Sequence, residues 1–169
     1  ITRGRIVLRK TKIDLRETAR SAIEALSPFM AERQTQLSVD IDDSAIPVYG
    51  DPARLQQIQA NLLSNASKYS PEGARVHFEV RRARQHAIIR VSDRGRGIER
   101  DMLPYIFDLF VQGPQSVART DGGMGIGLTL LRQLVQLHEG TVEAESEGPG
   151  RGTVFTVTLP LDAAEMRET

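Results

Sequence analysis

Apolar residues recur at helical spacing in three long stretches of the chain. The first stretch begins at Asp14, which forms a capping box with Glu17. The second begins at Asp51, where Pro52 follows at the first helical position. The third runs from about Gly125 to His138. This spacing predicts three amphipathic helices, each with one face directed at a core.

Three positions affect where these and other helices end. Pro28 is expected to kink or shorten the first helix, because proline removes a helical hydrogen bond. Gly140 is expected to end the third helix in the left-handed conformation. A short helix is expected over 101–107, and 112–123 lacks any period, which predicts a loop or lid.

Other stretches alternate apolar with polar residues, as strands with one solvated face do. They are Gly4–Arg9, Leu37–Ile41, Val76–Val80, Ala87–Asp93, Thr141–Ser146 and Thr153–Leu159. We therefore expect an α/β two-layer sandwich, in which a mixed, largely antiparallel sheet is covered on one face by three helices.

Length and composition fit one globular domain. The chain has 169 residues, of which 40% are hydrophobic, so we assign 1–161 to a single domain and 162–169 to a frayed tail or linker. Because the first residue is Ile1 rather than methionine, we expect a piece of a longer protein.

Charge and cysteine content exclude several classes of function. The chain has 22 basic residues (lysine plus arginine) and 22 acidic residues (aspartate plus glutamate), so it has no excess of positive charge to bind nucleic acid or a membrane. The absence of cysteine excludes disulfides and thiolate metal sites.

The second predicted helix carries an unusual polar row. Asn61, Asn65 and Lys68 fall at i, i+4 and i+7 and so share one face. A solvated helix edge would explain them, but asparagine is a poor helix former. Carboxamide oxygens suit Mg²⁺, and a lysine can reach phosphates. The row is therefore either a helix edge or part of an Mg²⁺–phosphate site.

Two glycine-rich segments and one short motif are further candidates. Asp93 ends a strand and is followed by Gly95 and Gly97, which could shape a pocket where Asp93 accepts an adenine amine, or could make a simple turn. Residues 122–128 hold four glycines before a helix, and backbone amides there could cradle phosphates. This segment lacks the Gly-Lys-Ser/Thr of a P-loop. Gly152-Thr153 alone indicates only a hairpin.

In combination these motifs resemble the catalytic domain of sensor histidine kinases. The order runs from an asparagine helix (61–70) through Asp-x-Gly-x-Gly (93–97), Phe-Asp-Leu-Phe (107–110) and Gly-x-Gly-x-Gly (123–127) to Gly-Thr (152–153), which matches the family's N, G1, F, G2 and G3 boxes. The resemblance covers about residues 8–161 and implies the Bergerat ATP-binding fold with ATP and Mg²⁺ as cofactors.

The resemblance also implies individual roles. Asn65 is similar to the main Mg²⁺ ligand, with Asn61 beside it, while Lys68 would contact phosphate and Arg119 the γ-phosphate. Asp93 is similar to the aspartate that reads adenine. The remaining implied nucleotide contacts are Tyr69, Gly95, Gly97, Ile98, Phe110, Gly123, Gly125, Ile126, Gly127, Leu128 and Thr153.

Two residues depart from the family pattern, and one residue separates its branches. Met124 stands where threonine is frequent, and Arg94 where asparagine or threonine is usual. The related ATPases and serine kinases carry an acidic general base four positions before the metal-binding asparagine, where this chain has Asn61. This favours a histidine kinase over a hydrolase, while a nucleotide-binding pseudokinase stays open.

The three histidines are interpreted as structural or surface residues. His138 precedes an acidic residue, as a phosphoacceptor does, but lies at a helix end, where a cation favours the helix dipole. The resemblance implies that the acceptor histidine lies on a separate dimerisation hairpin and that a response regulator receiver domain takes the phosphoryl group on. We therefore expect a cytoplasmic, monomeric catalytic domain that does not phosphorylate itself.

Overall fold

The computed structural model describes residues 6–108 and 124–166. The elements in chain order are β1 (Thr11–Asp14), α1 (Leu15–Glu32), β2 (Gln36–Ile41), β3 (Pro47–Gly50), α2 (Pro52–Lys68), β4 (Arg75–Ala83), β5 (His86–Asp93), η1 (Leu103–Tyr105), α3 (Met124–Leu137), β6 (Thr141–Glu145), β7 (Thr153–Pro160) and α4 (Ala163–Met166). No helix in these two ranges has the length and apolar character needed to cross a lipid bilayer.

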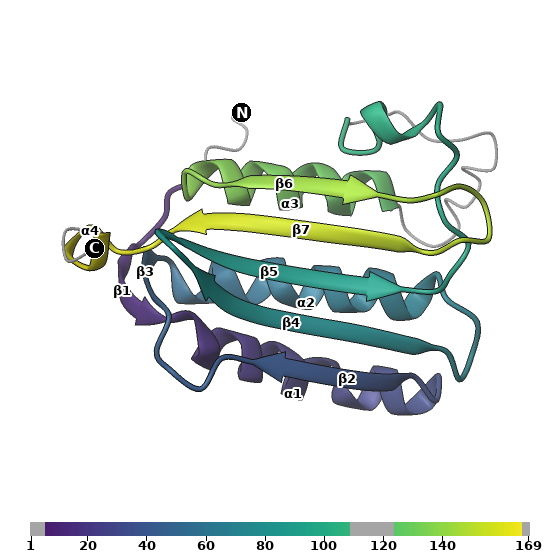
Figure 1. Ribbon diagram of the computed structural model, residues 1–169, viewed down its shortest axis with the longest axis horizontal. Helices are drawn as coiled ribbons and strands as arrows, with labels where there is room; N and C mark the ends of the chain where they lie inside the picture. The colour runs from purple at the N-terminus through teal and green to yellow at the C-terminus, as the bar shows by residue number, and fades with distance from the viewer. Residues whose placement is uncertain (1–5, 109–123, 167–169) are drawn as a thin grey trace.

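Within the described ranges, five strands form one mixed sheet in the order β2-β4-β5-β7-β6. The pair β2–β4 is parallel and the other pairs are antiparallel. The helices α1, α2 and α3 lie side by side on one face of this sheet (Figure 1). The predicted two-layer sandwich is therefore confirmed.

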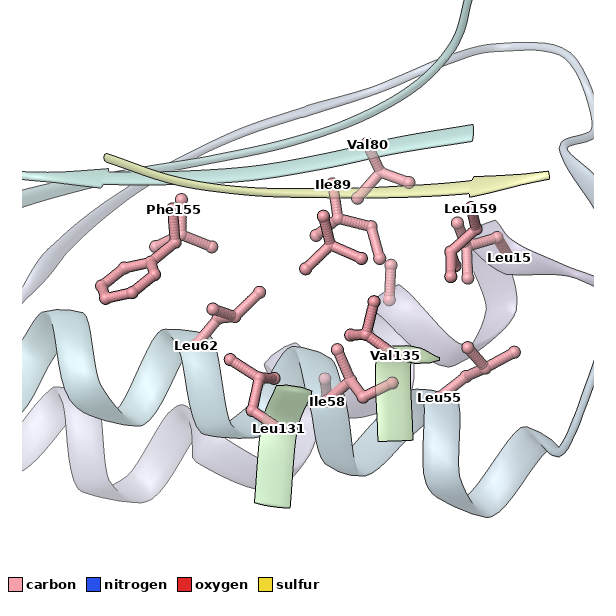
Figure 2. Packing of buried hydrophobic residues seen from close by; sticks show 14 of the residues in the cluster. Leu15, Leu55, Ile58, Leu62, Val80, Ile89, Leu131, Val135, Phe155 and Leu159 are labelled. Atoms are coloured by element: carbon pink, nitrogen blue, oxygen red, sulfur yellow. The ribbon is translucent and has the colours of Figure 1, made fainter. Parts of the chain in front are cut away.

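The core fills the space between the helix layer and the sheet (Figure 2). Side chains from the helices point toward side chains from the sheet, and all are nearly inaccessible to solvent: Leu15, Leu55, Ile58, Leu62, Leu131 and Val135 against Val80, Ile89, Phe155 and Leu159. Full burial of such a side chain contributes about 1.5–3 kcal/mol, so this layer supplies the main stabilisation of the fold.

Two short strands were not anticipated. The strand expected at Gly4–Arg9 is absent from 6–10, and the chain instead enters β1 at Thr11. There β1 pairs antiparallel with β3, in a separate two-stranded sheet. A strand of four residues is too short to show a reliable alternation of apolar and polar residues. β1 and β3 therefore form because they pair with each other, and no local pattern predicts them.

Two expectations about helix ends differ from the structure. Pro28 does not shorten α1, which continues to Glu32, while a kink at Pro28 stays a prediction. Pro28 and Glu24 are exposed, so water can satisfy the Glu24 carbonyl that loses its helical partner. After α3 it is Glu139, with φ 63°, that is left-handed. Gly140 is needed for another reason, since a Cβ there would collide with the Thr158 carbonyl of β7.

The expected short helix at 101–107 is only the 3₁₀ turn η1. After β7 the chain stays attached to the fold, because the Asp162 N–H donates to the Pro47 carbonyl at 2.9 Å before the single turn of α4. The domain boundary at residue 161 stays a prediction.

Candidate functional site

The polar row of α2 lies along the border of the helix layer. Asn61, Asn65 and Lys68 are half-buried, whereas their neighbours Leu62 and Ala66 are in the core. Because the same turn of helix buries one side in the core, the three polar side chains emerge together beside it. They are less exposed than a fully solvated helix edge would be, which fits a ligand site.

The C-terminal end of α2 is held by Arg33, which follows α1. The Arg33 guanidinium donates from Nε to the Ser67 carbonyl at 2.9 Å and from Nη2 to the Ser70 carbonyl at 2.7 Å. Ser67 is in the last turn of α2 and Ser70 follows its C-cap, so the guanidinium lies at the helix end where a cation is favoured by the dipole. Arg33 therefore sets where Lys68 and Tyr69 stand, a role that the motifs did not suggest.

Asp93 ends β5 in register with Val76 of β4 and Thr153 of β7. Its Oδ1 accepts a hydrogen bond of 2.7 Å from the Gly95 N–H. Burial raises the pKa of the Asp93 carboxyl, and hydrogen bonds with the backbones of Gly95 and Thr153 lower it in part. The side chain is thus a partly desolvated acceptor at the C-terminal end of the central strand of the sheet.

Glycine is required at two positions of the loop that follows Asp93. A Cβ on Gly95 would collide with the Tyr69 carbonyl oxygen, so the loop packs directly on the end of α2. Gly97 has φ 69°, and a Cβ on it would collide with the Gly148 carbonyl of the β6–β7 loop. The glycines therefore bring three backbone segments together.

A recess of about 580 Å³ opens where these segments meet, a size in the range of small-molecule sites. Its lining is basic and polar, with Lys68, Tyr69, Ser70, Pro71, Arg94, Gly95, Arg96 and Gly150. The Lys68 ammonium lies 5.6 Å and the Arg96 guanidinium 5.2 Å from the centre of the Tyr69 ring. The recess thus carries positive charge around an aromatic ring, which suits an anionic ligand with a planar base.

The N-terminal end of α3 lies within the predicted phosphate-covering segment. The first N–H groups of a helix have no intrahelical partner, so the backbone of Gly125, Ile126 and Gly127 could bind phosphate. Leu128 is buried in the core, so its side chain supports the helix from below and does not face a ligand. Phe110, Arg119 and Gly123, with the expected lid, lie outside the described residues.

Other predicted residues join the same region. Ile98 donates its N–H to the Ser146 hydroxyl at 3.0 Å, and Thr153 is buried beside Asp93. Near the predicted lid, the Thr129 hydroxyl donates to the Phe107 carbonyl at 2.8 Å, and Phe107 meets Phe155 edge-on. Ser146 was missed by sequence reasoning, although a serine before the turn-forming residues 147–150 is a signal for local hydrogen bonding.

The interpretation of the histidines holds, but the reason given for His138 was wrong. His138 is 5% exposed, its Nδ1 donates to the Leu134 carbonyl at 2.8 Å, and its Nε2 accepts from the Asp51 N–H at 3.1 Å. One donor and one acceptor define a neutral imidazole, and burial lowers its pKa. His138 therefore joins α3 to the start of α2, rather than placing a cation at a helix end.

The comparisons with known proteins agree with this geometry. Residues 50–163 match the family described as histidine kinase-, DNA gyrase B- and HSP90-like ATPase. The chain is 33% identical to the autoinducer 2 sensor kinase/phosphatase LuxQ of Vibrio parahaemolyticus over 98% of its own length and 20% of that protein. It thus spans about a fifth of this curated relative.

Solved structures show the same fold. The full-length ShkA structure in complex with AMPPNP matches with a TM-score of 0.77 and 27% identity, over 93% of this chain and 32% of ShkA. The catalytic domain of the histidine kinase ThkA matches with a TM-score of 0.80 and 21% identity, over 93% of this chain and 99% of that one. ThkA has also been solved with the response regulator protein TrrA. The chain belongs to the ATP-binding catalytic domains of two-component sensor histidine kinases.

Proposed function

We propose that this domain binds Mg²⁺–ATP and donates the γ-phosphate to a histidine on a separate dimerisation hairpin. A response regulator receiver domain would then take the phosphoryl group, as the ThkA complex with a response regulator suggests. The observation that carries the proposal is the position of Asp93, a partly desolvated acceptor between two glycine-bearing loops and the polar end of α2.

Adenine recognition follows from the chemistry of Asp93. A carboxylate has only acceptor sites, about four in all, so the Asp93 carboxyl can accept the exocyclic amine of adenine in addition to its backbone bonds with Gly95 and Thr153. Guanine presents a carbonyl oxygen at that position, and two acceptors repel each other. Tyr69 and the basic residues around it would then flank the base.

The α2 side chains fit a magnesium ion bound together with phosphates. Asn65 would be its main protein ligand and Asn61 a neighbour, while Lys68 would neutralise phosphate charge. The described residues contain no group of three or more histidine or acidic side chains placed to hold a metal. Mg²⁺ is typically held by few protein groups together with phosphate oxygens and water, so the carboxamides suffice. When bound, the ion would stabilise the charge that develops on the transferred phosphoryl group.

The residues favour transfer over hydrolysis. Asn61 stands where a hydrolase needs a base, and a carboxamide cannot accept a proton. The described histidines also make poor acceptors. His77 lies on the face of β4 that is turned away from the core and the helices. His138 is buried with both nitrogens hydrogen-bonded, and His86 begins β5, at the opposite end of that strand from Asp93. The acceptor would therefore come from another segment, in line with the γ-phosphate.

The test uses γ-labelled ATP and the domain, with and without the phosphoacceptor hairpin added as a separate polypeptide. Acid-labile label is expected only on the hairpin, and Asn65→Ala should abolish it. Label on a histidine of the domain alone would contradict the proposal. Rapid phosphate release without the hairpin would instead indicate the ATPase branch of the fold, and nucleotide binding without transfer a pseudokinase.

A further inference from the structure

The hydroxyl of Ser146 connects two loops of the candidate site. Ser146 follows β6, and its Oγ lies 3.0 Å from the Ile98 nitrogen and 3.2 Å from the Gly148 nitrogen. The same oxygen lies 2.7 Å from the Gly152 carbonyl and 3.3 Å from the Gly148 carbonyl. One half-buried side chain thus reaches the loop after Asp93 and both arms of its own loop.

These contacts use the full hydrogen-bonding capacity of a serine. A hydroxyl has one donor and two acceptor sites. The two N–H groups of Ile98 and Gly148 fill the acceptor sites, and the proton goes to the nearer carbonyl, that of Gly152. No other side chain of this size could satisfy all three groups without a rearrangement, except threonine.

The strand ladder does not itself hold the β6–β7 loop in place. The pairing of β6 with β7 ends at Glu145 and Val154, so 146–152 lie beyond it. The loop instead contacts the segment after Asp93, through Gly150 N–H to Arg96 carbonyl at 2.7 Å and Gly152 N–H to Gly95 carbonyl at 3.2 Å. Ser146 adds the side-chain bond that closes this arrangement.

The position of Asp93 depends on the same arrangement. A Cβ on Gly152 would collide with the Asp93 carbonyl, which shows that the backbones are in direct contact. Gly95 in turn donates to the Asp93 carboxylate. A shift of the β6–β7 loop would therefore move the backbone that orients the carboxylate.

We propose that Ser146 is a positioning residue for base recognition: it fixes the β6–β7 loop against residues 95–98 and thereby holds Asp93 in the orientation that selects adenine. This inference rests on the proposed function, since it assigns to Ser146 a share of that site's specificity. Ser146 acts through these backbone groups and not by contact with the nucleotide.

The experiment compares Ser146→Ala, Ser146→Thr and wild type for affinity toward ATP and ITP, by calorimetry on the same chain. ITP carries a carbonyl in place of the adenine amine. Ser146→Ala is expected to lower the affinity for ATP about tenfold and the affinity for ITP much less, so the preference for ATP falls. Ser146→Thr, which keeps the hydroxyl, is expected to retain the wild-type preference. Ser38→Ala is the matched control, because Ser38 is exposed on β2, where its hydroxyl bonds to Nδ1 of half-buried His77.

The outcomes separate the two proposals. A Ser146→Ala protein that keeps the wild-type preference for ATP would overturn the role of Ser146, even if its melting temperature fell. An equal loss for ATP and ITP would do the same, since a merely structural role predicts it. A wild-type protein with no preference for ATP would overturn adenine selection by Asp93, and this inference with it. If Ser146→Ala does not fold, Ser146→Cys, with a weaker donor and acceptor, must show the same selective loss of ATP affinity.

Discussion

At the scale of single residues, the fold holds the Asp93 carboxylate in a partly desolvated position, which costs stability and leaves the group in need of a hydrogen-bond donor. Burial raises its pKa, so the charged form is disfavoured relative to water. The Gly95 N–H and the Thr153 backbone offset part of this cost. A residue kept in this state needs a partner, and an adenine amine would supply one.

Asp93→Asn tests this role with almost no change in shape. The carboxamide replaces an acceptor by a donor, so ATP affinity should fall about 10- to 100-fold, the range for a hydrogen bond to a charged group. Because the folded-state pKa of Asp93 is raised, the wild-type carboxylate costs stability above that pKa and the cost disappears as pH falls through it. At neutral pH the variant should therefore melt no lower than wild type. Calorimetry with ATP and a thermal melt provide both measurements; unchanged ATP affinity would contradict the assignment.

At the scale of elements, α2 is anchored at both ends by residues from elsewhere in the chain. At its start Asp51 caps the helix by accepting from the N–H groups of Ala53 and Arg54, and its own N–H donates to His138 of the α3 end. At its other end Arg33 binds two carbonyls. The helix that carries the polar row is therefore held in position along its axis.

The start of α2 should respond to pH. Burial lowers the pKa of His138, the nearby Lys10 lowers it further, and the Leu134 carbonyl and Asp51 oppose this. Lys10 in turn lies 3.9 Å from Glu139. In the unfolded chain the histidine has its ordinary pKa of 6.5, so as the pH falls the unfolded state takes up the proton first. The free energy of unfolding should therefore decrease as pH falls from about 6.5 toward the lower pKa of the folded state.

His138→Gln should flatten this dependence, measured as the free energy of unfolding in urea between pH 5 and pH 7.5. The control is His86→Gln, since His86 is exposed. If both variants keep the wild-type slope in this range, another group controls the pH response.

The other end of α2 is tested by Arg33→Ala. Loss of the two charge-assisted hydrogen bonds to backbone carbonyls should destabilise the fold by about 1–3 kcal/mol. It should also lower the affinity for ATP, because Lys68 and Tyr69 are then no longer held in position. Arg20→Ala, on the exposed side of α1, should change neither. Urea unfolding measures the change in stability and calorimetry the change in ATP affinity. An ATP affinity equal to that of the wild type would show that Arg33 contributes to stability alone.

At the scale of the whole molecule, the site lies at one end of the sandwich. The segments 67–71, 93–98 and 146–152 are far apart in sequence and meet at the right-hand end in Figure 1, where β5 ends and β7 begins. The core beneath them comes from all three long helices. A nucleotide bound there would contact both halves of the chain, so it should stabilise the fold as a whole.

Mg²⁺–ADP should therefore raise the melting temperature in a concentration-dependent way. A ligand that binds only the folded state contributes about 2.7 kcal/mol at a hundredfold excess over its Kd. Chelation of the metal should remove much of the shift, because the phosphates would lose the ion held by Asn65. Mg²⁺–GDP should give a much smaller shift at equal concentration. A shift that is the same with and without metal would contradict the predicted role of the asparagines.

The sequence pattern alone was enough to predict the helices and strands that bury one face and expose the other. The helical periods predicted α1, α2 and α3, and alternation predicted the five strands of the main sheet, because burial of one face repeats every 3.6 or 2 residues. Pattern also pointed to Asp93, Asn61, Asn65 and Lys68, since those residue types are unusual where they stand. The order of the glycine motifs identified the family.

Tertiary structure decided what depends on residues distant in sequence. The bond between Asp51 and His138 spans 87 positions and that between Ile98 and Ser146 spans 48, so no local window contains either pair. The neutral state of His138 follows from such a contact, not from its place at a helix end. Gly140 likewise appears in sequence as a helix-ending glycine, yet it is required because β7 passes against it. Periodicity reports which side of an element is buried, and only the packed chain shows what that side meets.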